Sequence, residues 1–232
     1  MKRFAALLFV LLLVLTGCQG KTVMEGDGAK ISNMEFAYHF WTEINSSKEA
    51  LQEQVDMSKP LDEQMYDETT TWQDYLIDQV LAQVERTMCL VTVAEEVGFG
   101  LPAEYEDSLD DVMVNFADAA MGLGYKNVSA YLKDLYGRGA DEESFRAYLY
   151  NTHLATAYAE NLYNTTVPTE EEVLAYMEKA PAVYGEDGME HALRDLHSED
   201  YNNAIMTAIN GCTFTTHREN IRITAPKGLD EN

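Results

Sequence analysis

The chain has 232 residues and carries 40 acidic side chains against 16 basic ones, which gives a formal net charge of −24. Such a charge repels the phosphates of nucleic acids and of anionic lipid headgroups. It argues against a nucleic-acid partner and against a body that lies flat on such a membrane. The length is sufficient for one or two domains with a hydrophobic core.

The N-terminus has the layout of a secretory signal. Two basic residues precede an apolar run at 4–15, which is too short for a comfortable permanent membrane span. The sequence Leu-Thr-Gly-Cys at 15–18 resembles a bacterial lipobox, a signal in which the cysteine thiol is acylated and the chain is cut before it. We therefore expect a signal peptide at 1–17 and lipidation of Cys18, with the protein anchored by acyl chains to the outer face of the cell membrane. An ordinary signal peptide or a single anchor helix is the alternative.

The segment after the lipobox is predicted to connect the lipid to the fold. Residues 18–29 are polar and rich in glycine, a composition typical of a flexible tether. Ser32 and Glu35 then have the spacing of a capping box, which indicates the start of a short amphipathic helix rich in aromatic residues. The polar stretch at 46–70 is expected to be a loop.

A long helix is predicted over residues 72–98. Its apolar side chains recur at helical spacing, and they cover much of the helix circumference. Thr71 and Asp74 are placed to cap its first turn, and Gly98 marks its end. We expect this helix to be the central pillar of the fold.

Capping and breaking residues delimit several further helices. Asp141 is a candidate N-cap, and Thr169 with Glu172 forms another capping box. The expected helices span 102–122, 128–136, 141–167 and 169–179. Together these patterns predict an all-α domain at 30–179.

The pattern becomes weaker after residue 180. The segment 180–232 has no clear apolar stripe, and we expect it to be an irregular tail or the remnant of a lost domain. Ser198 is predicted to cap a short helix that ends near Gly211. Alternation at 221–224 indicates at most a minor strand.

Several of these features together resemble the N-terminal domain of the SurA/PrsA family of extracytoplasmic foldases. They are Gly28, Ile31, Ser32, Glu35 and Phe36 in order, the long helix that ends AEEVGFGLPAEYEDSL, and the final VPTEEEVLAYMEK. The resemblance covers about residues 28–178, and the lipobox matches the Gram-positive members. It implies a SurA N-terminal-like helical chaperone domain. Many members continue into a parvulin-type prolyl isomerase domain, for which the residues after 180 are too few and lack alternating strands.

No motif predicts a reactive centre. Six residues with metal-ligating chemistry lie close in sequence, but two histidines six positions apart are about 120° from eclipsed on a helix, so we expect a solvated loop and no metal or cofactor. These residues are Glu190, His191, Asp195, His197, Glu199 and Asp200. Cys89 lies in an apolar helical pattern and is expected to be a small buried side chain. An extracytoplasmic compartment permits its pairing with Cys212, but no spacing indicates it.

We therefore expect a membrane-anchored chaperone-like protein that binds unfolded segments of secreted proteins and has no catalysis of its own. Tyrosine and methionine suit adaptable contacts of low specificity. The predicted groove lies between the long helix and its neighbours. Its lining is predicted to include Phe36, Phe40, Trp41, Tyr148 and Tyr150. The alternatives are a peptidyl-prolyl isomerase and a passive binding lipoprotein of the envelope.

Overall fold

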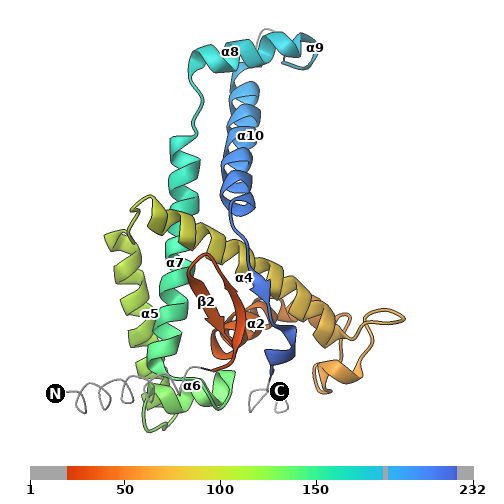
Figure 1. Ribbon diagram of the computed structural model, residues 1–232, viewed down its shortest axis with the longest axis vertical. Coiled ribbons are helices and arrows are strands. Elements are labelled where there is room, and N and C mark those ends of the chain that lie inside the picture. The colour runs from red at the N-terminus through yellow and green to blue at the C-terminus, as the bar shows by residue number, and fades with distance from the viewer. Residues whose placement is uncertain (1–19, 185–187, 224–232) are drawn as a thin grey trace, which may run out of the picture.

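The computed structural model describes residues 20–184 and 188–223, so the predicted signal peptide and Cys18 lie outside the described residues. The described part is mostly helical, as expected, with one small three-stranded sheet (Figure 1). Within it, no helix is both long enough and apolar enough to cross a membrane.

The first regular element of the described residues is a β-hairpin, which lies where a tether was expected. Strand β1 (Thr22–Gly26) pairs antiparallel with β2 (Ala29–Ser32). The turn residues Asp27 and Gly28 both have positive φ, of 46° and 82°, which is the geometry that tight hairpin turns favour. Since β1 begins at Thr22 and Val23 and Met24 are fully buried, the predicted tether at 18–29 is wrong from residue 22 onward.

Helix α2 (Asn33–Ser46) is surrounded by the rest of the protein. The Ser32 Oγ accepts a hydrogen bond from the backbone N–H of Glu35 at 3.1 Å and so caps the first turn. A helix of average length normally buries one stripe, whereas α2 buries side chains around most of its circumference. The buried residues are Phe36, Ala37, Tyr38, His39, Phe40, Trp41 and Ile44.

The stretch after α2 was expected to be a loop, and it is partly regular. It contains helix α3 (Lys48–Gln52) and the 3₁₀ turn η2 (Leu61–Glu63). Between and after these elements, the Gln64 side chain holds the loop together. Its Nε2 donates to the carbonyls of Asp56 and Lys59, and its Oε1 accepts from the backbone N–H of Asp56.

Helix α4 (Trp72–Glu96) is the predicted central pillar. Thr71 caps it by accepting a hydrogen bond from the N–H of Asp74 at 3.1 Å. Gly98, with φ of 71°, follows its end, as expected of a residue that must adopt a left-handed conformation. Helix α4 contacts α2, α7 and α10, which together enclose the main core.

A second, smaller core lies between α2 and the next helices of the chain. These are α5 (Ala103–Gly122), α6 (Val128–Tyr136) and α7 (Glu142–Thr165), the last capped by Asp141. Tyr38 extends from α2 into this core, where its ring meets Phe145 at 5.1 Å and its hydroxyl lies 2.8 Å from the Ser144 hydroxyl.

The segment predicted to be an irregular tail is largely helical. Helix α8 (Glu170–Lys179) is followed by α9 (Pro181–Tyr184) and by α10 (Met189–Asn210), a helix that begins nine residues before the expected cap at Ser198. The end of α7 from Ala159, α8, α9 and α10 form an extension from the body, which we call the arm (Figure 1).

The C-terminal part of the described chain returns to the N-terminal hairpin. Strand β3 (Thr215–Thr216) pairs with the free edge of β1, so that the sheet order is β2-β1-β3. The 3₁₀ turn η3 (Arg218–Asn220) follows. The minor strand is therefore present, but at 215–216 rather than at 221–223, where the residues that the structure describes have no regular form.

Candidate functional site

The five residues predicted to line a binding groove do not come together on a surface. Phe36, Phe40 and Trp41 belong to the main core and are at most 2% exposed, while Tyr148 belongs to the second core. Only Tyr150, on α7, is exposed. The expected groove beside the long helix is filled by these side chains, so this part of the site prediction is wrong.

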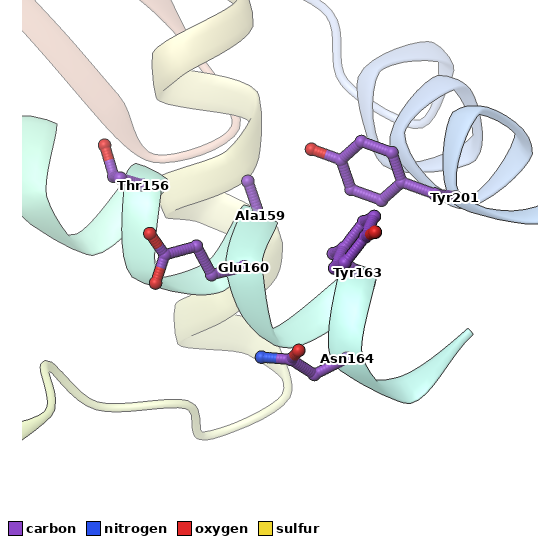
Figure 2. A pocket seen from close by; sticks show the side chains of 6 residues that line it. All are labelled: Thr156, Ala159, Glu160, Tyr163, Asn164 and Tyr201. Carbon is purple, nitrogen blue, oxygen red and sulfur yellow. The ribbon is translucent and has the colours of Figure 1, made fainter. Parts of the chain in front are cut away.

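An aromatic cluster on the arm is accessible instead (Figure 2). Tyr163 near the end of α7 and Tyr201 on α10 meet edge to face with ring centroids 5.4 Å apart. The imidazole of His197 lies 4.2 Å from the Tyr163 ring. Its Nε2 is 2.7 Å from the Tyr163 carbonyl oxygen, and since a carbonyl only accepts, this nitrogen carries the proton. The contact fastens α10 to α7 while the Tyr163 ring remains 49% exposed.

Two surface hollows flank this cluster and share both tyrosines. One lies mainly along α7, and Figure 2 shows Tyr163 and Tyr201 on one side of it with Glu160 and Thr156 further along the helix. The other lies along α10. Its lining consists of Tyr163, Glu190, Leu193, Arg194, His197, Ser198 and Tyr201. The shared rings make the two hollows one continuous surface.

Apolar side chains remain exposed over the whole arm. At its tip, Leu174 and Ala175 of α8 lie in a further hollow beside the carboxylates of Glu170, Glu171 and Glu178. Six large apolar side chains of the arm are between 37% and 65% exposed. They are Tyr163, Val167, Leu174, Val183, Leu193 and Met206. Exposure of so many apolar groups on one projecting element is typical of a surface that contacts another molecule.

The arm is also strongly acidic. Its described residues, 159–184 and 188–210, include nine acidic side chains and only two basic ones, Lys179 and Arg194. The negative field that results favours ligands with positive charge and keeps copies of the arm from associating with each other.

The residues singled out for possible metal chemistry lie on a helix rather than in a solvated loop. His191 and Asp195 are one turn apart on α10, with Nε2 and Oδ2 3.5 Å apart, and the Tyr184 hydroxyl donates to the same Oδ2 at 3.0 Å. Among the residues that the structure describes, no three histidine, cysteine or carboxylate side chains converge as a metal site would require.

Packing shifts the pKa values of two side chains of α2, the buried His39 and the half-buried Glu35. Burial lowers the pKa of His39 to about 4, and its Nε2 has no hydrogen-bond partner within the described structure. Burial raises the pKa of Glu35, although the Asn151 side chain donates to its Oε1 at 2.9 Å. For both residues desolvation is the largest cause, so their shifted pKa values are consequences of packing.

Comparison with known proteins gives no further guidance: no protein-family model, no curated protein and no solved structure matches the chain. The SurA/PrsA resemblance therefore remains a prediction from sequence.

The sequence contained one signal for the arm surface, which our interpretation missed. Helix α10 buries only Ala192, Ile205 and Ala208 along its length, which is why residues 180–210 show no apolar stripe. A helix of good local propensity without a stripe is one that contacts little of the core. Leu193 and Met206 could have been identified as exposed on that basis.

Proposed function

We propose that the protein is a membrane-anchored, ATP-independent chaperone-like lipoprotein of the SurA/PrsA type, without a parvulin domain, that binds unfolded segments of secreted proteins through its arm. The observation that carries the proposal is that six large apolar side chains between Tyr163 and Met206 are exposed. They belong to an element that projects from the body (Figure 1). The function is placed outside the cytoplasm because of the predicted lipidation of Cys18.

The chemistry of the arm suits extended polypeptide. Tyr163 and Tyr201 offer rigid rings with polar edges, which contact varied side chains at low entropic cost. The two hollows adjoin each other and are open to solvent. A site for a small molecule, by contrast, usually encloses most of the ligand surface. Once a client segment has made one weak contact, its neighbouring residues are held at high effective concentration near the next contact site. The segment can therefore bind without a single deep pocket.

Because the arm is acidic, we expect it to prefer client segments that contain both basic and apolar residues. Glu160 and Glu190 stand beside the aromatic cluster, and Glu170, Glu171 and Glu178 surround Leu174. Lysine and arginine side chains of a client would meet these carboxylates while neighbouring apolar residues contact the rings. Since the carboxylates are exposed, this contribution falls as salt concentration rises.

Suppression of aggregation tests the proposal. The chain from residue 18, with Cys18→Ser in place of the lipid, is mixed at stoichiometric amounts with a chemically unfolded basic protein, and light scattering is followed. We expect clear suppression. The double variant Tyr163→Ser, Tyr201→Ser should lose most of it, whereas Val114→Ser, Met121→Ser should not, because those two side chains are more exposed but lie on α5.

The alternatives predict different results. A passive envelope lipoprotein would leave the scattering of the unfolded protein unchanged. A peptidyl-prolyl isomerase would accelerate cis–trans exchange in a proline peptide well above the uncatalysed rate, and the arm variants would retain that activity. Either result would overturn the proposal.

A further inference from the structure

The two cysteines of the described chain lie together where the arm joins the body. Cys89 is buried in the middle of α4, and Cys212 follows the end of α10. The Cys212 Sγ is 3.8 Å from the Cys89 carbonyl oxygen, and the Cys89 Sγ is 3.7 Å from the carbonyl oxygen of Ile209. The two thiols also interact with each other. The fold thus brings together two thiols that are 123 residues apart in sequence.

We infer that Cys89 and Cys212 are a dithiol pair that is oxidised to a disulfide, which locks the base of α10 onto α4. The inference concerns these two side chains and does not depend on the proposed function. An oxidising extracytoplasmic compartment, which the signal sequence predicts, is where such a bond persists.

The surroundings of the two thiols differ, and this difference determines which thiol reacts first with the oxidant. Cys212 is half-buried and lines a surface hollow together with Asp27, Thr92 and Gly211, so a small disulfide can reach it. Cys89 is enclosed, and burial raises its pKa to about 12. Because the thiolate is the nucleophile in exchange, the first reaction should occur at Cys212.

The reaction balances with a low-molecular-weight disulfide as the oxidant. The Cys212 thiolate attacks one sulfur of the oxidant, which forms a mixed disulfide and releases one thiol. The Cys89 sulfur, after losing its proton, attacks the Cys212 sulfur and releases the second thiol. Two protein thiols and one oxidant disulfide become one protein disulfide and two free thiols, so two electrons pass to the oxidant.

The bond would have a mechanical consequence for the arm. The closed loop contains the end of α4, helices α5 to α9 and all of α10. A crosslink over so long a loop restricts the unfolded chain strongly, provided that the native geometry is not strained. It also prevents α10 from separating from α4 while the arm is loaded.

Oxidised glutathione is the probe for the test. The folded chain from residue 18 carries Cys18→Ser, so that only Cys89 and Cys212 remain. Incubation should reduce the titratable thiols from two to none, lower the intact mass by two hydrogen atoms, and yield one proteolytic fragment that joins the two cysteines. The melting temperature should be about 10 °C higher than after reduction.

Single variants define the order and the specificity. Cys89→Ala should stop at a glutathione adduct on Cys212, whereas Cys212→Ala should react far more slowly because only the enclosed thiol remains. The inference is overturned if the parent chain keeps both thiols, if it ends as a glutathione adduct, or if it forms only disulfide-linked dimers. Loss of chaperone activity in the arm variants, by contrast, would leave this result unaffected.

Discussion

Asn33 and Arg222 exchange two hydrogen bonds across 189 residues of sequence. The Asn33 Nδ2 donates to the Arg222 carbonyl at 3.1 Å, and the Arg222 backbone N–H donates to the Asn33 Oδ1 at 2.6 Å. The Asn33 amide therefore pairs with both backbone polar groups of Arg222, as a neighbouring strand would. The neighbouring Asn220 side chain donates to the Thr22 carbonyl at 2.8 Å, so that the first and last described segments close the fold together.

Removing this clamp should destabilise the protein. Asn33→Ala deletes both hydrogen bonds, and we expect a loss of about 1–2 kcal/mol in the free energy of unfolding. Asn202→Ala, on the exposed surface of α10, is the matched control and should change stability by less than about 0.5 kcal/mol. Urea denaturation of both variants measures the difference, and equal stabilities would contradict the role given to Asn33.

Gly26 is a glycine whose replacement should be poorly tolerated. A Cβ at this position would lie 2.0 Å from the Thr213 carbonyl oxygen, so the backbone of β1 or of the segment before β3 would have to move. We expect Gly26→Ala to cost about 2 kcal/mol or more. Gly122→Ala is the control, since its Cβ meets nothing within 4 Å at the end of α5. Thermal melts should show a lower transition temperature only for Gly26→Ala.

The capping box at the tip of the arm should control the stability of α8. The Thr169 Oγ1 accepts from the N–H of Glu172, and the Glu172 carboxylate accepts from the N–H of Thr169 at 2.8 Å. Thr169→Ala should destabilise α8 by about 1 kcal/mol, which would increase amide exchange in that helix by roughly fivefold.

Thr207→Ala is the control for that prediction. This threonine lies within α10 and its hydroxyl donates only to the carbonyl one turn earlier, so no cap is lost. Hydrogen exchange followed by mass spectrometry distinguishes the two helices. Unchanged exchange in α8 of Thr169→Ala would show that packing against α10, rather than the cap, maintains the helix.

His39 should make the protein less stable in acid. Its pKa is about 4 when folded and near 6.5 when unfolded, so between these values the unfolded chain binds a proton that the folded chain does not. Stability contributed by neutral His39 is therefore complete above pH 6.5 and is lost as the pH falls toward 4, by roughly 3 kcal/mol at most.

The matching experiment compares His39→Leu with the parent chain by urea denaturation from pH 7 to pH 4.5. The variant should lose much less stability over this range. Burial raises the pKa of Glu35, which acts in the opposite direction because that contribution is lost as pH rises, but it is common to both proteins. His191→Leu, on the exposed face of α10, should keep the acid sensitivity. Parallel curves for parent and His39→Leu would refute the assignment.

Local rules placed the helices of the body well. Thr71, Asp141 and Thr169 were predicted as caps from their position before apolar or acidic runs, and each accepts the expected backbone hydrogen bond. The predicted end of the long helix, at residue 98, lies two residues after the observed end of α4 at Glu96. These features depend on contacts three or four residues apart, which sequence periodicity reports directly.

The course of α10 was not found because its partners are distant in sequence, whereas the hairpin has a local signal, the Asp27-Gly28 turn, which our interpretation missed. Val23 and Met24 are buried in the main core beside residues of helices far along the chain, and glycine-rich composition concealed the strand. The site prediction failed for a related reason. Phe36 and Tyr163 are both aromatic residues on helices, and only the position of each helix in the fold decides which is enclosed.

The amino-acid sequence by itself determined the strongly acidic character, the helical class and the starts of the main helices, since composition and short-range capping suffice for these. Only the tertiary structure decided which apolar side chains stay in contact with water, that the first and last strands of the described residues share one sheet, and that Cys89 meets Cys212. Each of these depends on segments far apart in sequence, and burial is a property of their packing rather than of any residue alone.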